Sequence, residues 1–184
     1  MGYPGLIAAA DNDGMIYKME DSPIFEYDLS PVSGGWTTQG SANGIWLVPT
    51  SNPPMVSSIH PTDAAYGFRP MPDVKPNMTD APGTVMRVVE IDIWYRRKNA
   101  ASVVTFSMYR ARRDGAGAGA KVIDLDGTQF TVVTDTWTKY TSTTVVAMDP
   151  TYFYWFEFSV DPDASQFDAC IGPVLVRASR DVVE

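Results

Sequence analysis

Apolar and polar side chains alternate with a period of two through most of the second half of the chain, which is the pattern of half-buried β-strands. Residues 152–160 show this pattern most clearly. One face of the segment carries Tyr152, Tyr154, Phe156, Phe158 and Val160. The opposite face carries Phe153, Trp155 and Glu157. Burial of the first face is worth roughly 1.5–3 kcal/mol per side chain, so the segment is predicted to be a core strand.

The same alternation predicts further strands over residues 89–95, 103–112, 121–125, 129–133, 138–148 and 171–178. No segment has the apolar spacing of an amphipathic helix of three turns. Many short strands at this spacing are typical of a β-sandwich or a β-barrel. We therefore predict an all-β, antiparallel fold for residues 85–184.

The composition changes near residue 84, because 11 of the 14 prolines and nine of the 14 glycines precede it. Proline lacks the N–H group that a sheet interior needs, so the first half cannot be a regular sheet throughout. Short strands are still predicted over residues 5–10, 15–19 and 44–48, the first two joined by a hairpin turn. Residues 1–84 are therefore predicted to form an irregular arm, with proline-broken residues 49–82 lying over their own domain or a neighbouring subunit.

The charge balance limits the possible partners. The chain has 22 acidic and 14 basic side chains, a formal net charge of −8, which disfavours nucleic acid and anionic membrane as partners. No apolar stretch reaches membrane-spanning length, and the first residues lack the basic start of a signal peptide. Cys170 is the single cysteine, so no intrachain disulfide is possible, and we expect it to be a small buried core residue.

Catalytic chemistry has few candidates in this sequence. His60 is the one histidine, and no Gly-x-Ser-x-Gly nucleophile motif is present. One His and one Cys are too few for a zinc site built from those ligands. We therefore predict a protein that is not an enzyme, with no catalytic, cofactor or metal residues. Glu90 and Asp92 share a strand face with Trp94, so a carboxylate glycosidase is kept as a third hypothesis.

Calcium is the one metal for which the sequence offers a weak candidate. Asp161, Asp163 and Asp168 could supply carboxylate oxygens, although a solvated loop is the favoured interpretation of these residues. Two Asp-x-Asp-Gly segments, at residues 11–14 and 124–127, lack the closing Glu of a calcium loop and are interpreted as hairpin turns.

The candidate contact residues are aromatic and basic, and they are Trp94, Arg96, Arg110 and Arg112. Trp94 is expected to be exposed, because its neighbours on the same strand face are charged. The arginines belong to two basic runs, residues 96–98 and 110–113, on strands expected to be adjacent. They would form a basic patch that either pairs with acids on neighbouring strands or docks on the acidic first half of another copy.

Four segments of the second half carry a resemblance to a known family, namely Trp137-Thr-Lys-Tyr140, Thr143-Thr-Val-Val146, Tyr152-Phe-Tyr-Trp-Phe-Glu-Phe158 and Ile171-Gly-Pro-Val-Leu-Val176. They resemble the C-terminal part of galactose-binding-like jelly rolls, which occur as carbohydrate-binding modules and in virion proteins of tailed bacteriophages. The resemblance covers about residues 85–180 and implies a jelly-roll-like β-sandwich. It departs at Ile171-Gly172-Pro173, where carbohydrate-binding relatives often carry an Asp.

The resemblance and the arm together predict a virion structural protein, because an irregular arm on a jelly roll is similar in style to phage capsid-decoration and tail proteins. We expect such a protein to be a capsid decoration (cement) or tail component. It would self-associate, as a trimer, contact other virion proteins, and reside in the virion after synthesis in the host cytoplasm. The alternative is a carbohydrate-binding module that recognises a surface glycan, with Trp94 at its site.

Overall fold

The computed structural model describes residues 24–30, 36–39, 45–48, 51–59, 64–71 and 84–182. These residues form β-strands and no helix, so none of them belongs to a helix long and apolar enough to cross a membrane. The strands are β1 (Ile24–Asp28), β2 (Thr37–Gln39), β3 (Ile45–Val48), β4 (Met55–Ser58), β5 (Ala65–Pro70), β6 (Thr84–Arg97), β7 (Val103–Arg112), β8 (Ala120–Leu125), β9 (Thr134–Ser142), β10 (Val146–Ala147), β11 (Tyr152–Asp161) and β12 (Ala169–Val182).

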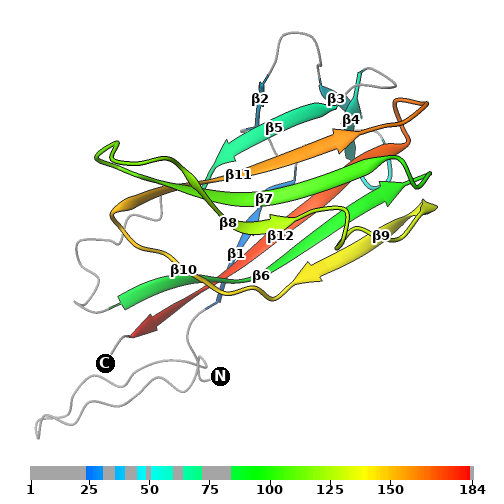
Figure 1. Ribbon diagram of the computed structural model, residues 1–184. Coiled ribbons are helices and arrows are strands. Elements are labelled where there is room, and N and C mark those ends of the chain that lie inside the picture. The colour runs from blue at the N-terminus through cyan, green and yellow to red at the C-terminus, as the bar shows by residue number, and fades with distance from the viewer. Residues whose placement is uncertain are drawn as a thin grey trace, which may run out of the picture.

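The strands form two antiparallel sheets packed face to face, which confirms the predicted all-β sandwich (Figure 1). The seven-stranded sheet is built on β6 and β12, each 14 residues long, which pair with one another along most of their length. β9 and β10 pair with successive parts of β6, while β1 and β4 pair with successive parts of β12 and β3 follows β4. The five-stranded sheet has the order β2-β5-β11-β7-β8 and faces the reader in Figure 1.

The hydrophobic core lies between the sheets and follows the predicted alternation. On β11 the inward side chains Tyr154, Phe156, Phe158 and Val160 are all buried, whereas Phe153 is 40% exposed on the other face. β7 contributes the buried Val104, Phe106 and Met108 in the same way. The Phe106 and Phe156 rings of these two strands stack with centroids 5.6 Å apart.

The alternation of β6 shifts by one residue near its start. Ile91, Ile93 and Tyr95 point into the core as predicted, but Val88 is fully buried and Val89 is only half-buried. The reason is a bulge in the pairing with β12, where Glu90 lies opposite Arg177 but Val88 lies opposite the next residue, Ala178. An extra residue on one strand changes the face to which the following side chains point.

Two predicted strands differ from the observed ones. Residues 129–133 form no strand, because Gln129 and Phe130 both donate backbone hydrogen bonds to the Asp126 carbonyl in a turn. Phe130 then inserts into the core, with its ring centroid 4.8 Å from that of Tyr95. The strand predicted over 138–148 is divided into β9 and β10. The hairpin predicted within residues 5–19 lies outside the described residues.

The described strands that precede residue 84 belong to the sandwich itself. β4 and β5 lie in the segment expected to be an irregular arm, and they pair with β12 and β11 of the second half. Leu29, Val56, Ala65 and Met71 are buried in the shared hydrophobic core. The composition change at residue 84 therefore does not separate the described strands into two packing units.

The outer face of the seven-stranded sheet carries a charge network centred on Asp92. This carboxylate is 2% exposed and accepts hydrogen bonds from Thr141 Oγ1 (2.5 Å), Arg177 Nη1 (3.1 Å) and Lys139 Nζ (3.3 Å). Arg177 also pairs with Glu26 of β1, at 3.1 Å. Burial raises the pKa of Asp92, but the hydrogen bonds from Thr141, Arg177 and Lys139 outweigh burial and hold that pKa below its usual range.

Asp92→Asn is expected to lower the free energy of unfolding at neutral pH by about 1.5–3 kcal/mol, because the hydrogen bonds to a buried charged acceptor are lost. Because the pKa of Asp92 is lower in the folded state than in the unfolded state, its ionised carboxylate stabilises the fold at pH values above the unfolded-state pKa of about 3.9. This stabilisation is lost as the pH falls towards the folded-state pKa. The variant should therefore lose less stability than the wild type as the pH falls through this acidic range. Urea unfolding at a series of pH values measures both effects.

The matched control is Asp135→Asn, since Asp135 is exposed where it pairs with Arg96 and Lys98. An exposed ion pair contributes about 0.2–1 kcal/mol, so this variant should stay within about 1 kcal/mol of the wild type. Equal destabilisation by the two substitutions would contradict the central role of Asp92.

Deletion of residues 1–83 is expected to abolish the cooperative unfolding transition. The deletion leaves β11 without β5 and β12 without β1 and β4, and it removes apolar side chains from the shared core. Circular dichroism during thermal unfolding of the 84–184 chain tests this, with a 24–184 chain as control because it retains β1–β12. A sharp transition in the 84–184 chain would show that the second half folds alone.

Candidate functional site

The four contact residues predicted from the sequence lie in different sheets. Trp94 and Arg96 belong to β6 in the seven-stranded sheet, whereas Arg110 and Arg112 belong to β7 in the five-stranded sheet. The expectation that the two basic runs lie on adjacent strands is wrong, because the chain crosses from one sheet to the other between β6 and β7. Arg110 is also seven residues beyond the start of β7, roughly 23 Å along the strand at 3.3 Å per residue.

The side chains of these residues contact groups of the protein itself. The Arg96 guanidinium lies over the Trp137 ring, 5.5 Å from its centroid, and Arg110 lies 4.5 Å over Tyr152. Arg112 forms an exposed salt bridge with the residue two positions along the chain, Asp114. Two of these contacts are with aromatic rings and the third is with an acid two residues away, so they differ from the expected pairing with acids on neighbouring strands. A role of these residues in contacting a partner stays a prediction.

Two further residues of the basic runs also have internal partners. Arg97 is buried, and its guanidinium donates to the carbonyl oxygens of Ser102 (2.6 Å), Ala100 (2.9 Å) and Phe130. These hydrogen bonds connect the β6–β7 loop to the backbone at Phe130, whose side chain packs in the core. Lys98 forms a salt bridge with Asp135, at 3.2 Å.

Asp168, the buried member of the candidate calcium set, organises a loop through nitrogen donors. Its Oδ2 accepts hydrogen bonds from the backbone N–H groups of Ala164 (3.2 Å) and Ser165 (2.8 Å) and from Asn99 Nδ2 (3.2 Å). A cation at Oδ2 would have to displace these donors. Within the described part of the chain, no group of three or more His, Cys, Asp or Glu side chains could hold a metal ion.

The outer face of the five-stranded sheet carries a row of aromatic side chains. β11 is central in this sheet and presents Phe153 and Trp155 outward, and Tyr109 of β7 lies opposite Trp155. The Tyr109 and Trp155 rings are nearly parallel, at 11° with centroids 5.3 Å apart. The Phe153 and Trp155 rings are at 23° with centroids 6.0 Å apart. Three roughly parallel rings therefore form an aromatic platform, a term used below for Phe153, Trp155 and Tyr109.

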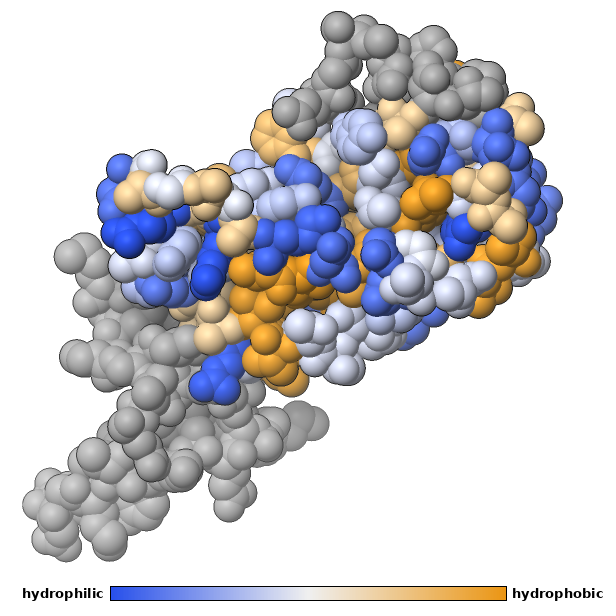
Figure 2. All heavy atoms as spheres, viewed as in Figure 1, coloured by the Kyte–Doolittle hydropathy of each residue, from blue (hydrophilic) through white to orange (hydrophobic). Residues whose placement is uncertain are grey.

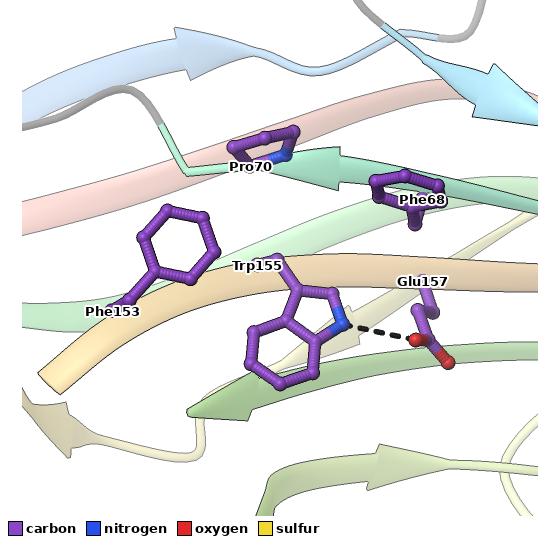
Figure 3. Close-up of a pocket in the computed structure, with 5 residues that line it drawn as sticks. All are labelled: Phe68, Pro70, Phe153, Trp155 and Glu157. Atoms are coloured by element: carbon purple, nitrogen blue, oxygen red, sulfur yellow. Dashed lines mark hydrogen bonds between the residues drawn. The ribbon is translucent and has the colours of Figure 1, made fainter. Parts of the chain in front are cut away.

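A shallow pocket of about 320 Å³ adjoins this platform, between β5 and β11. Its lining residues are Phe68, Pro70, Phe153, Trp155 and Glu157. Figure 3 shows Phe68 and Pro70 extending from β5 and the other three side chains from β11, so that rings border the pocket on both strands. A pocket of mostly aromatic lining with one charged group is typical of small-ligand sites.

The Trp155 indole, shared by platform and pocket, is held in place from several directions. Its Nε1–H donates to Glu157 Oε1 at 2.9 Å. Tyr109 stacks against the ring, and a Cβ on Gly119 would lie 3.1 Å from Trp155 Cη2. The glycine at the end of the β7–β8 loop therefore leaves room for the indole. A ring fixed before binding loses little conformational entropy when a ligand arrives.

Polar side chains extend this face across β7 and β8. Lys121 Nζ lies 5.5 Å over the Tyr109 ring and 2.9 Å from Asp124 Oδ1, and the hydrogen bond to Asp124 raises the pKa of Lys121. Ser107 Oγ donates to the same Asp124 carboxylate, at 3.2 Å. Figure 2, in the same view as Figure 1, shows hydrophilic and hydrophobic residues interleaved on this face.

The sequence pattern of residues 152–160 already indicated this site, although Trp94 was the tryptophan predicted to contact a ligand. The alternation places Phe153, Trp155 and Glu157 on the face of the strand that points away from the core. Two aromatic side chains on an outward face are candidates for contact with a ligand. The contributions of Tyr109 and Phe68 depend on strand register, which brings them opposite Trp155 and Glu157.

No protein-family model and no curated protein sequence matches the chain. Among solved structures, it is similar to the CBM22-1-GH10 modules of Clostridium thermocellum xylanase Xyn10B complexed with xylohexaose (13% identity, TM-score 0.48, 77% of this chain and 26% of that one). It is also similar to the enzymatically active domain of tailspike protein 4 of bacteriophage CBA120 (13% identity, TM-score 0.43, 81% and 19%). The CBM22-1 xylan-binding domain of Paenibacillus barcinonensis Xyn10C is a third (13% identity, TM-score 0.44, 89% and 96%).

The chain thus spans about a quarter of the first of these structures and about a fifth of the second. All three TM-scores are below 0.5.

Proposed function

We propose that the protein binds a carbohydrate on the outer face of its five-stranded sheet. The observation that carries this proposal is the aromatic platform beside the Glu157 pocket. The apolar C–H face of a pyranose ring packs on an aromatic face, and the hydroxyl groups around its edge need hydrogen-bond partners. The platform offers the first kind of surface, and Glu157 and the Ser107–Asp124–Lys121 group offer the second.

The mixed polarity of this face favours a hydroxyl-rich ligand over a large apolar partner. Protein–protein interfaces that bury a continuous apolar core would require a broader hydrophobic patch. Here the Phe153 and Trp155 rings follow one another along β11, and the Tyr109 ring lies beside Trp155 on β7. Hydrophilic residues lie beside these rings on the same face (Figure 2). A row of this kind suits several successive sugar units of a chain.

Binding without turnover remains our expectation for this face. Few side chains on this face could act on a glycosidic bond, since Glu157 accepts a hydrogen bond from Trp155 and Asp124 is paired with Lys121. Trp94, on the opposite sheet with Lys139 over its ring, belongs to an alternative site that the control variant below distinguishes from the platform. Assembly into a virion, and a trimer in particular, stay predictions from the sequence.

Trp155→Ala is expected to weaken glycan binding by at least about tenfold, which corresponds to about 1.4 kcal/mol, because it removes the central ring of the platform. Binding partners would first be found by screening the full chain on a glycan array. Isothermal titration calorimetry with the strongest hit then gives the affinity of each variant.

The matched control is Trp94→Ala, which removes a tryptophan from the outer face of the other sheet and should leave affinity unchanged. Thermal unfolding of both variants shows whether the fold is retained. Loss of binding in Trp94→Ala alone would move the site to the seven-stranded sheet, and no glycan binding by the intact protein would overturn the proposal.

A further inference from the structure

Glu157 is the charged group of the pocket, and no basic side chain among the described residues forms a salt bridge with it. Phe68, Pro70, Phe153 and Trp155 complete the lining, so the pocket contains one carboxylate and no cation. Glu157 Oε1 accepts the indole N–H of Trp155. Among the salt bridges of the described residues, none involves Glu157.

The neighbours of Glu157 across the sheet are also uncharged. Phe68 lies opposite it on β5 and Ser107 lies opposite it on β7. The nearest basic residue by register is Arg69 of β5, which lies opposite the core residue Phe156 and donates to the Asp28 carbonyl (3.4 Å). Lys121 of β8 lies opposite Tyr109 and is paired with Asp124. Other carboxylates of the protein have such partners, as Asp92 does with Arg177 and Lys139.

A ligand that covers this pocket would remove water from an uncompensated carboxylate. That loss of solvation is costly unless an opposite charge replaces the water. Aromatic rings also attract cations through their electron-rich faces, and rings with a carboxylate among them form a site suited to an ammonium group. A neutral hydroxyl group can donate a hydrogen bond to Glu157, but it cannot neutralise the charge.

We propose that the pocket binds the protonated amine of an amine-bearing sugar unit, such as a glucosamine residue within a glycan chain. This rests on the proposed function, because the platform is what holds the sugar rings. Glu157 supplies the ion pair, while Phe68, Phe153 and Trp155 surround the ammonium group. A volume of about 320 Å³ is at the lower end of the range for small-ligand pockets, which suits one sugar unit.

The test compares glucosamine oligomers of one length in two forms, fully deacetylated and fully N-acetylated, by calorimetry with the full chain. The measurements are made at a pH where the free amine is protonated. The wild type is expected to bind the deacetylated oligomer at least about tenfold more tightly. Glu157→Gln should remove this preference, because its amide carbonyl still accepts from Trp155 Nε1 but carries no charge.

Asp126→Asn is the matched control, since it removes one negative charge from an exposed residue just beyond β8, outside the platform and the pocket, and its amide oxygen can still accept from Thr128. It should keep the preference for the deacetylated oligomer. An equal loss of preference in Glu157→Gln and Asp126→Asn would show general attraction of a cationic chain to an acidic protein, and would overturn the inference.

Two other results separate this inference from the proposed function. If the wild type binds both oligomers equally and Trp155→Ala weakens both, the amine site is wrong but the platform binds carbohydrate. If neither oligomer binds while a neutral glycan does, the inference fails and the proposed function again stands. If no carbohydrate of any class binds, both fail.

Discussion

Strand β11 lies in the middle of the five-stranded sheet, hydrogen-bonded to β5 on one side and to β7 on the other. Its period-two alternation sends Tyr154, Phe156, Phe158 and Val160 into the core and Phe153, Trp155 and Glu157 to the outer face. A slip of one residue would exchange the two sets, so the energy that buries the first set also fixes the position of the second. The candidate site is thereby held by the hydrophobic core beneath it.

The opposite sheet depends on a different pair of strands. β6 and β12 pair over most of 14 residues each, and shorter strands occupy their outer edges end to end. Its outer face is covered by the network of Asp92, Arg177 and Lys139, in which opposite charges contact each other directly. Among the described residues the two outer faces therefore differ in chemistry. On one face Asp92 pairs with Arg177 and Lys139, whereas the other face carries partly exposed rings and Glu157 without a salt bridge.

The aromatic platform contains a ring, Trp155, that is fixed in position before any ligand binds. Trp155 is fixed by its hydrogen bond to Glu157, by stacking on Tyr109 and by the close approach of Gly119. The same hydrogen bond orients one oxygen of Glu157 and leaves the other for a ligand. Recognition of flat sugar rings and recognition of a positive charge can therefore arise from one small group of residues on two adjacent strands.

The sequence by itself determined the all-β class, the core face of β11 and β7, and most strands of the second half, because period-two alternation is a local property of the chain. It also placed Trp155 and Glu157 on a face that points away from the core. It did not show that β4 and β5 join the sandwich, since frequent prolines conceal short strands whose partners are distant in sequence. Tertiary structure alone decided which strands are neighbours. It separated Arg96 from Arg110 by placing β6 and β7 in different sheets, and it brought Phe68, Tyr109 and Trp155 together. The physical reason is that strand order and register are set by hydrogen bonds and packing between distant segments, which no local pattern encodes.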